Sequence, residues 1–197
     1  MIQIQTVPVG ELAANCYVLS LAERDDAIVI DPGAEEPAVR LALGGRKIAA
    51  ILLTHGHYDH IGAVAALRAD GAKVYIGADD AKALTNPAYS LAALFGGAPS
   101  QGEADETLSD GQLLELAGIS LRVLHTPGHT KGGCCFLTDE KSLFAGDTMF
   151  RRSYGRTDLP GGDDREMALS LARLRALDAE TRVYPGHGAP TTIGEER

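Results

Sequence analysis

Three of the six histidines in the chain lie within one short stretch, His55 to His60. They are His55, His57 and His60, and Asp59 stands just before the last of them. Imidazole and carboxylate groups in this H-x-H-x-D-H order are typical ligands of Zn²⁺, and they also suit iron and manganese. His55 and His57 are two residues apart, so both side chains point to the same side of an extended segment. Asp59 and His60 then begin an expected helix, which puts them on another wall of the same pocket.

Three further candidate ligands lie in similar local settings. His129 stands in TPGHT, Asp147 in GDT and His187 in PGHG, and each motif follows an expected strand. Taken singly, each is an ordinary turn or surface residue. Residues at strand ends are those that an α/β fold gathers into a pocket, so together with the first cluster they predict a metal site. The remaining histidine, His125, is expected to support a metal ligand or the structure rather than to bind metal.

Hydrophobic patterning indicates the elements that must position these motifs. Strands are predicted at 2–7, 16–21, 27–30, 48–53, 73–76, 112–116, 119–124, 133–137, 142–145 and 182–184. Helices are predicted at 35–43, 60–70, 81–84 and 88–95, and a last one begins at 163–164. The run at 48–53 is continuously apolar, as in a strand covered on both faces, whereas 119–124 alternates.

Strands with covering helices occur in both halves of the sequence. This order predicts two packed sheets with helices outside, in a single domain spanning residues 1–197. The acidic and turn-rich stretch at 96–111 predicts a surface loop between the two halves.

Composition limits the partners that the protein can have. The chain has 197 residues, with 45% hydrophobic and 23% charged side chains, as in ordinary globular domains. Lys and Arg number 18 against 27 Asp and Glu, and the net charge of -9 argues against nucleic acid or an anionic membrane as a partner. No run reaches the roughly 20 apolar residues of a membrane span.

The cysteines favour a reducing compartment. Cys16, Cys134 and Cys135 are odd in number, and they lack the C-x-x-C spacing of a metal site. We interpret them as small buried side chains. With no targeting segment at the N-terminus, we expect a cytoplasmic protein.

The motifs THGHYDH, TPGHT, GDT and PGHG, in this order, resemble those of the metallo-β-lactamase superfamily. The resemblance runs from the IDPG turn at 30–33 to PGHG at 185–188. Within the superfamily, GDTMFRRSYGRTDLPGGD and the ending PTTIGE resemble the glyoxalase II-like branch, the hydroxyacylglutathione hydrolases. Glyoxalase II proper carries an extra C-terminal helical domain. We expect this chain to lack it, because the sequence ends ten residues after His187.

The resemblance implies an α/β fold, the four-layer αβ/βα sandwich, with two divalent metal ions between the sheets. We expect zinc, with iron or manganese as alternatives. The implied ligands are His55, His57 and His129 for the first ion, Asp59, His60 and His187 for the second, and Asp147 for both. Asp59 is also the implied catalytic residue, because it would orient the attacking water.

Two divalent ions lower the pKa of a shared water from 15.7 to about 7, which supplies hydroxide at neutral pH. The resemblance therefore implies a hydrolase whose metal-bridging hydroxide cleaves a thioester, with S-(2-hydroxyacyl)glutathione as the first expected substrate. Such a small molecule is anionic, so basic side chains near the motifs are candidate contacts. These candidates are Lys131, Arg151, Arg152 and Arg156, together with Tyr58 as a lining residue. Arg156 has an alternative interpretation as an ion-pair partner of Asp158.

Other functions share much of this motif set. Persulfide dioxygenases of the superfamily bind one iron through two histidines and an aspartate, and they also carry the G-R-T-D stretch found here at 155–158. Lactonases, β-lactamases and other ester hydrolases use the same ligand frame. Metal content and oxygen uptake separate a dioxygenase from a hydrolase. A metal-stabilised binding module without activity is disfavoured, because it leaves a complete ligand set for an open two-metal site unexplained.

Overall fold

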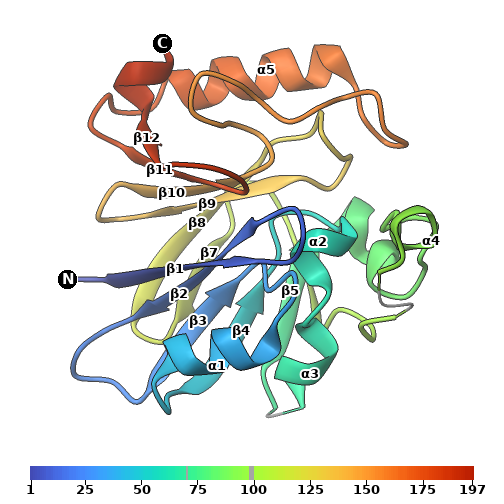
Figure 1. Cartoon of the computed structure of the whole chain (residues 1–197). Coiled ribbons are helices and arrows are strands. Elements are labelled where there is room, and N and C mark those ends of the chain that lie inside the picture. Colours follow the sequence, from blue (N-terminus) through green and yellow to red (C-terminus); the bar gives the residue numbers. More distant parts are fainter. Residues whose placement is uncertain (70, 98–99) are drawn as a thin grey trace.

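Figure 1 shows the computed structural model of the protein, which describes residues 1–69, 71–97 and 100–197. The elements follow in this order: β1 (Gln3–Val9), β2 (Ala14–Ser20), β3 (Asp26–Ile30), α1 (Glu36–Leu43), β4 (Lys47–Leu52), α2 (Tyr58–Ile61), α3 (Val64–Arg68), β5 (Lys73–Gly77), the 3₁₀ helix η1 (Ala78–Leu84), α4 (Ala92–Phe95), β6 (Glu106–Leu108), β7 (Leu113–Leu116), β8 (Ile119–His125), β9 (Cys134–Thr138), β10 (Ser142–Gly146), α5 (Asp164–Arg175), β11 (Arg182–Pro185), β12 (Thr191–Thr192) and the 3₁₀ helix η2 (Ile193–Glu196).

The strands form two sheets, one from each half of the chain. The first sheet has the order β1-β2-β3-β4-β5-β6. Its first three strands pair antiparallel, and β3 to β6 pair parallel. The second sheet has the order β12-β11-β10-β9-β8-β7, and only β10 and β11 pair parallel in it. The expected pair of sheets is therefore confirmed.

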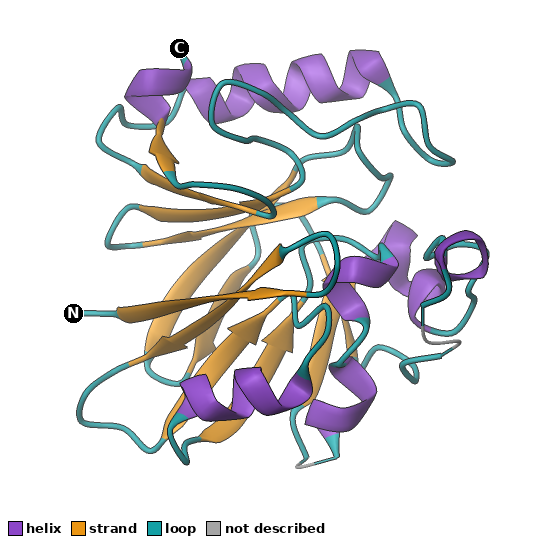
Figure 2. Cartoon of the chain, viewed as in Figure 1, coloured by secondary structure: helices purple, strands orange, loops and turns teal. Residues whose placement is uncertain are grey.

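Separate hydrophobic clusters define the layers. In the first, Val39 of α1 and Leu67 of α3 pack with the outer face of the first sheet. The second lies between the sheets, where Ile30 and Phe136 meet. In the third, Leu171 of α5 packs with residues of the second sheet. Figure 2 shows the resulting order of helix, sheet, sheet and helix. This is the predicted four-layer αβ/βα sandwich.

Successive side chains of the central strands point to opposite faces of the sheet and belong to different hydrophobic clusters. In β2, Cys16 and Val18 belong to the outer cluster, while Tyr17 faces the other sheet. In β9, Cys134 faces the first sheet and Cys135 faces α5. The period of two along a strand explains this division. The cysteines are free and buried, and act as core side chains.

Strand direction brings the motif loops to one edge of the sandwich. β8 runs antiparallel to β9, and β9 runs antiparallel to β10, so β8, β10 and β11 all point the same way. The loops after these strands carry His129, Asp147 and His187. The loop after β4 carries the first histidine cluster from the other sheet. Within the described residues, no helix is long and apolar enough to cross a membrane.

The prediction of one helix at 60–70 is wrong in its extent. Two short helices, α2 and α3, stand in its place. The break follows from a competing contact, because the N–H of Ala63 donates to Pro32 O at 2.9 Å instead of continuing the helix. The turn after β3 therefore interrupts the helix at this point. The expected end at residue 70 lies outside the described residues.

The acidic stretch at 96–111 is only partly the surface loop that its composition predicts. It contains β6, which pairs in parallel with β5 and completes the first sheet. Residues 98–99 of this stretch lie outside the described part. The predicted start of the last long helix is confirmed, since the Asp163 side chain accepts hydrogen bonds from the N–H groups of Arg165 and Glu166.

Candidate metal centre

Three histidines from two loops form the first half of the site. Nδ1 of His57 and Nε2 of His129 lie 2.9 Å apart, although one loop follows β4 and the other β8. The ring of His55 lies 4.8 Å from that of His57 and 4.9 Å from that of His129, measured between centroids. All three side chains are buried, and one nitrogen of each lies within 4.8 Å of the others. We call this group the three-histidine half.

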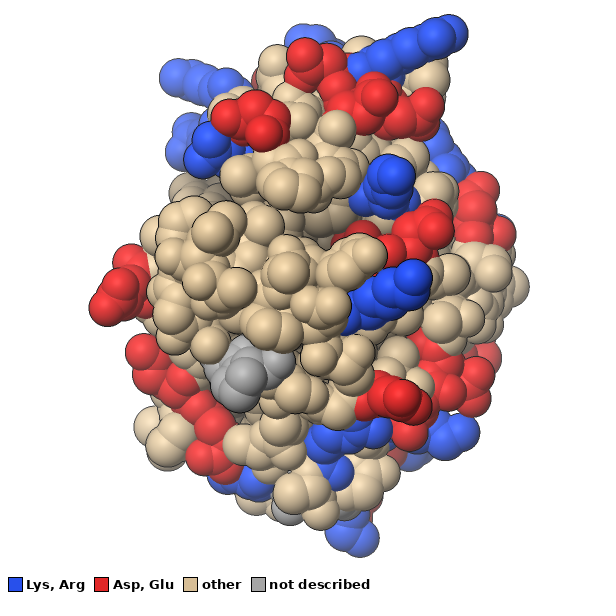
Figure 3. Space-filling view, turned by 90° about the vertical axis from the view of Figure 1, so that its right-hand side faces the viewer, with Lys and Arg blue, Asp and Glu red and all other residues tan. Residues whose placement is uncertain are grey.

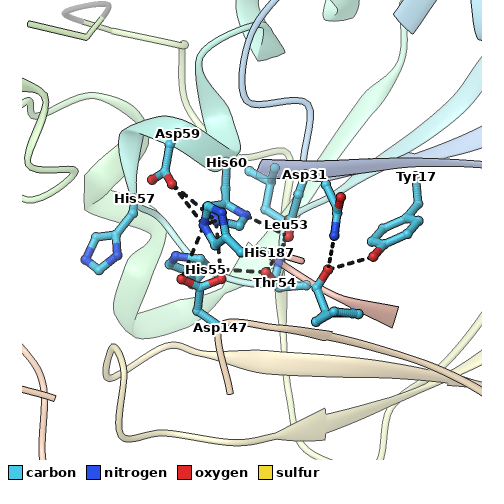
Figure 4. A network of polar contacts seen from close by, with 12 residues as sticks. Tyr17, Asp31, Leu53, Thr54, His55, His57, Asp59, His60, Asp147 and His187 are labelled. Atoms are coloured by element: carbon cyan, nitrogen blue, oxygen red, sulfur yellow. Dashed lines mark hydrogen bonds and ion pairs between the residues drawn. The ribbon is translucent and has the colours of Figure 1, made fainter. Parts of the chain in front are cut away.

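Asp59, His60 and His187 form a second group, the mixed half. Nε2 of His187 lies 3.3 Å from Nε2 of His60 and 3.3 Å from Oδ2 of Asp59. Nε2 of His60 lies 3.5 Å from the same carboxylate oxygen. Figure 4 shows these side chains converging, with His57 standing to one side. Asp59 and His60 come from α2 and His187 from the loop after β11, so both sheets contribute to this half as well.

Asp147 lies between the two halves. Its Oδ2 is 3.5 Å from Nε2 of His129 and 3.7 Å from Nε2 of His187. Its Oδ1 is 3.4 Å from Nε2 of His60. One carboxylate therefore faces nitrogens of both halves, which is the position required of a bridging ligand.

The donor atoms of the site are arranged for binding metal ions rather than for hydrogen bonding to one another. Nε2 of His55 and Oδ1 of Asp147 are buried and have no hydrogen-bond partner. Buried polar atoms of this kind are rare without a ligand. Donors at 2.0–2.1 Å from a tetrahedral ion stand roughly 3.3 Å apart, close to the spacings found here. The residues present therefore fit divalent ions, and the ligand role of each side chain stays a prediction.

The outer ring nitrogens fix which nitrogen each histidine presents to the site. The Nδ1–H group of His55 donates to Thr54 Oγ1 at 3.1 Å, and that of His60 donates to Asp31 Oδ2 at 3.1 Å. The Nδ1–H group of His129 donates to Arg156 O at 2.7 Å, and that of His187 donates to Leu12 O at 3.1 Å. These four rings therefore present Nε2. His57 alone in this set presents Nδ1. Such outer contacts orient ligating histidines and set their tautomers.

Asp31 is a site residue that the sequence reasoning missed. It follows β3 directly, and its carboxylate accepts from the N–H of Thr54 at 2.8 Å and from the Thr54 hydroxyl at 2.6 Å, besides His60. Its backbone is left-handed, with a φ of 52°, a conformation that Asp tolerates better than most residues. Its position at the end of a buried strand, like that of the ligands, is the signal that identifies it.

Burial and neighbouring charges shape the titration of the cluster. Burial lowers the pKa of His57 to about 3, with a further contribution from His129, so its ring is neutral at pH 7. Burial opposes a charge on His60, but the carboxylates of Asp147 and Asp59 outweigh it and raise the pKa of His60 to about 10. Burial likewise opposes ionisation of Asp59, but the nearby His60 and His187 hold its pKa well below the usual range. Asp59 is therefore ionised at neutral pH.

A cavity of about 310 Å³ opens beside the three-histidine half, and His57 lines it. Lys131 and Tyr89 also line this cavity. Tyr58 is half-buried and stacks on Phe95, with ring centroids 5.5 Å apart. Figure 3 shows the face of the molecule that lies to the right in Figure 1, where acidic atoms are visible in a hollow with basic side chains beside it. Of the predicted substrate contacts, Lys131 is thus placed on a cavity that reaches the site.

The predicted arginines lie differently. Arg156 is exposed and forms a two-pronged ion pair with Asp158, with both nitrogen–oxygen distances at 2.7 Å, as the alternative interpretation expects. Its backbone carbonyl, rather than its side chain, contacts His129. Arg151 and Arg152 are also exposed, and the N–H of Arg152 donates to Glu196.

His125 stands apart from both halves. Its Nε2–H donates to Lys131 O at 3.0 Å, and its own N–H donates to Asp110 at 2.8 Å. Arg173 of α5 donates to the carbonyl of His125 at 3.0 Å and also pairs with Asp110. These contacts tie the end of β8 to α5, which agrees with the structural role among the two that were expected.

The family model of the metallo-beta-lactamase superfamily matches residues 9–187 of the chain. The chain belongs to the metallo-beta-lactamase superfamily. The matched region contains every residue of both halves and Asp147. This agrees with the resemblance of the motifs and with the sandwich fold.

Similar proteins and solved structures extend the comparison. The chain is 34% identical to the hydroxyacylglutathione hydrolase GloC of Haemophilus influenzae, over 98% of this chain and 94% of GloC. The crystal structure of the B3 metallo-beta-lactamase BLEG-1 is similar with a TM-score of 0.93 and 36% identity, over 98% of this chain and 96% of that one. The di-iron-bound form of TTHA1623 has a TM-score of 0.86 and 40% identity, with the same coverage of 98% and 96%.

Proposed function

We propose that this protein is a hydrolase with two divalent metal ions that cleaves a thioester of an anionic carrier. The first candidate substrate is S-(2-hydroxyacyl)glutathione. The observation that carries the proposal is the pair of donor groups joined by Asp147, with atoms that are buried and left without partners. The similarity to GloC, whose name is hydroxyacylglutathione hydrolase, supports the choice of a thioester.

The two halves support a proposal for the residues that hold the metal ions. His55, His57 and His129 would hold one ion, Asp59, His60 and His187 the other, and Asp147 both. When bound, two such ions supply a water of lowered pKa and an electrophile for the carbonyl oxygen of the substrate.

Asp59 is the residue that we propose to orient the nucleophile. Its carboxylate lies beside His60 and His187 in the mixed half and is ionised at neutral pH. An ionised carboxylate accepts the hydrogen of a water molecule beside it and holds that water in one direction. Asp31 accepts from the Nδ1–H of His60 and so holds that ring in place beside Asp59.

The cavity beside the three-histidine half is the proposed place for the carrier. Its lining includes His57 from the site and the cation Lys131, together with the carboxylates of Asp79 and Asp80. An anionic group of the carrier would therefore meet Lys131. Such a solvated contact contributes about 1 kcal/mol, and its role is to hold the carrier rather than to assist the reaction.

The donor set suits zinc, which we propose as the first candidate, with iron and manganese as alternatives. The di-iron form of TTHA1623 supports iron as a serious alternative. The similarity to BLEG-1 makes a β-lactam the second candidate substrate, on the same metal centre. A persulfide dioxygenase with one iron is the third candidate function.

One set of measurements tests the proposal. Elemental analysis of the purified protein is combined with thioester hydrolysis, β-lactam hydrolysis and oxygen uptake with a persulfide. We expect about two ions per chain, hydrolysis of the glutathione thioester and no oxygen uptake. One tightly bound iron with oxygen uptake would replace the hydrolase by the dioxygenase. Two ions with β-lactam turnover and no thioester turnover would keep the centre and change the substrate.

A further inference from the structure

Asp80 is a buried carboxylate outside the ligand set. It follows β5 as the third residue of η1, and only 8% of it is exposed, whereas its neighbour Asp79 is exposed. Burying a carboxylate is costly unless its oxygens accept hydrogen bonds. The hydrogen-bond partners of Asp80 therefore show which parts of the structure this buried carboxylate holds.

Those partners all belong to the two loops of the three-histidine half. Oδ2 of Asp80 accepts from the N–H of Gly56 at 3.0 Å and from the hydroxyl of Thr130 at 2.7 Å. Oδ1 accepts from the N–H of Gly132 at 2.8 Å. Gly56 separates His55 from His57, and Thr130 directly follows the third histidine. One side chain thus ties together the loop after β4 and the loop after β8.

The contact is too close for the loops to shift around the carboxylate. A Cβ at Gly132 would lie 2.4 Å from the backbone nitrogen of Asp80 and 2.7 Å from its Cγ. The loop therefore packs directly on the carboxylate, with no space for an intervening water. Among the described residues, the Asp80 carboxylate forms no hydrogen bond with a ligand side chain, so it acts on the histidines through their loops.

A second buried carboxylate, Asp31, lies behind the mixed half. Asp31 accepts from Thr54 and from His60, and so orients a ring of that half directly. Asp31 follows β3 and Asp80 follows β5, on either side of β4, which carries the histidine loop. Asp31 also reaches His55 of the three-histidine half, because the Thr54 hydroxyl that donates to Asp31 accepts from Nδ1–H of His55. Among the described residues, the carboxylate of Asp80 by contrast accepts only from the two loops of the three-histidine half.

We propose that Asp80 is the positioning residue of the three-histidine half. It sets the distance between the loop of His55 and His57 and the loop of His129, and thereby determines how tightly that half holds its ion. The ion of the mixed half is held independently of Asp80. This inference rests on the two-metal centre of the proposed function, but not on the identity of the substrate.

The test is a competition titration that resolves the affinities of two Zn²⁺ ions in Asp80→Asn and in the unchanged protein. An amide in place of the carboxylate directs an NH₂ group at an N–H donor of one loop. We expect one ion to bind 10- to 100-fold more weakly and the other to keep its affinity. Asp79→Asn removes the same charge from the adjacent exposed position and is expected to leave both affinities unchanged.

Two variants of the neighbouring hydroxyl keep the test independent of folding problems at Asp80. Thr130→Val removes one of the three hydrogen bonds and should weaken the same ion, while Thr130→Ser should restore it. Thermal unfolding of the metal-free variants shows whether a general loss of stability accompanies the change. Equal weakening of both ions, or no change in either, would overturn the proposal.

The same experiment separates this inference from the proposed function. If the unchanged protein binds a single ion, the two-metal hydrolase fails. Asp80 is then judged by that one ion: a 10- to 100-fold loss in Asp80→Asn, with restoration in Thr130→Ser relative to Thr130→Val, retains the positioning role. An unchanged affinity in Asp80→Asn removes it.

Discussion

Gly186 offers a sharp test of where Asp147 stands. A Cβ added at Gly186 would lie 2.1 Å from Oδ1 of Asp147 and 2.9 Å from Cε1 of His60, whereas ordinary contact begins at 3.4 Å. The Gly186→Ala methyl group therefore points into the metal centre between the two halves. Either the loop after β11 or the carboxylate of Asp147 must move by more than an ångström.

The expected effects differ for stability and activity. Overpacking of this kind costs about 1–3 kcal/mol of unfolding free energy. A ligand to two ions tolerates far less displacement, because carboxylate oxygens bind divalent ions within a narrow range around 2.0–2.2 Å. A misplacement of about 1 Å lowers kcat/KM by roughly 100-fold. We therefore expect Gly186→Ala to stay folded, to lose metal and to lose nearly all activity.

Gly188 supplies the matched control within the same motif. A Cβ there meets nothing within 4 Å, but its φ of +78° is left-handed. Gly188→Ala should therefore lose about 1–2 kcal/mol of stability from backbone strain and keep its metal. The assays are elemental analysis, steady-state kinetics and urea unfolding of both variants. Full metal content and full activity in Gly186→Ala would refute the placement of Asp147 at the centre.

Three further predictions concern the site. Asp147→Ala should lose both metal and activity, because it removes the carboxylate that faces both halves. His125→Ala should keep its metals. Equal metal contents in the two variants would contradict the ligand assignment. Lys131→Gln should raise KM for the glutathione thioester about fivefold with kcat little changed, as about 1 kcal/mol of carrier binding implies; unchanged KM with intact circular dichroism would point to a neutral substrate. The metal-free protein should unfold at lower urea at pH 5 than at pH 7. Burial lowers the pKa of His55 and His57, so the unfolded state binds more protons below its pKa of about 6.5, and His57 alone accounts for a loss of about 2 kcal/mol. The raised pKa of His60 opposes this loss by only about 1 kcal/mol, so the protein is still less stable at pH 5. Equal midpoints at both pH values would show that these rings are not buried neutral.

Hydrophobic patterning was sufficient to predict the layers of the fold. The continuous apolar run of β4 lies between two clusters, with Ile51 facing α3 and Leu52 facing the second sheet. The alternation of β8 buries Ile119, Leu121 and Val123, as predicted. Burial of apolar side chains decides these elements, and burial follows from residue type and period alone.

The elements and residues that the sequence did not predict depend on contacts between distant segments. The break between α2 and α3 comes from a hydrogen bond between Ala63 and Pro32, two loops that only the folded sheet brings together. Asp31 and Asp80 also act across the fold, on groups 23 to 52 positions away. Residue type and local spacing do not indicate which distant residues form such pairs. The histidine motif was different, because its unusual density of ligands is visible within a few residues.

The arrangement of the donors ties metal binding to the packing of the two sheets. The three-histidine half takes two side chains from the first sheet and His129 from the second. The mixed half likewise combines Asp59 and His60 with His187. Neither sheet alone therefore offers a complete half. The apolar cluster between the sheets already includes fully buried Phe136, so the interface does not need an ion in order to close. Each ion would instead add a bond across an interface that hydrophobic packing has formed, and the buried carboxylates behind each half make that geometry available before any ion binds.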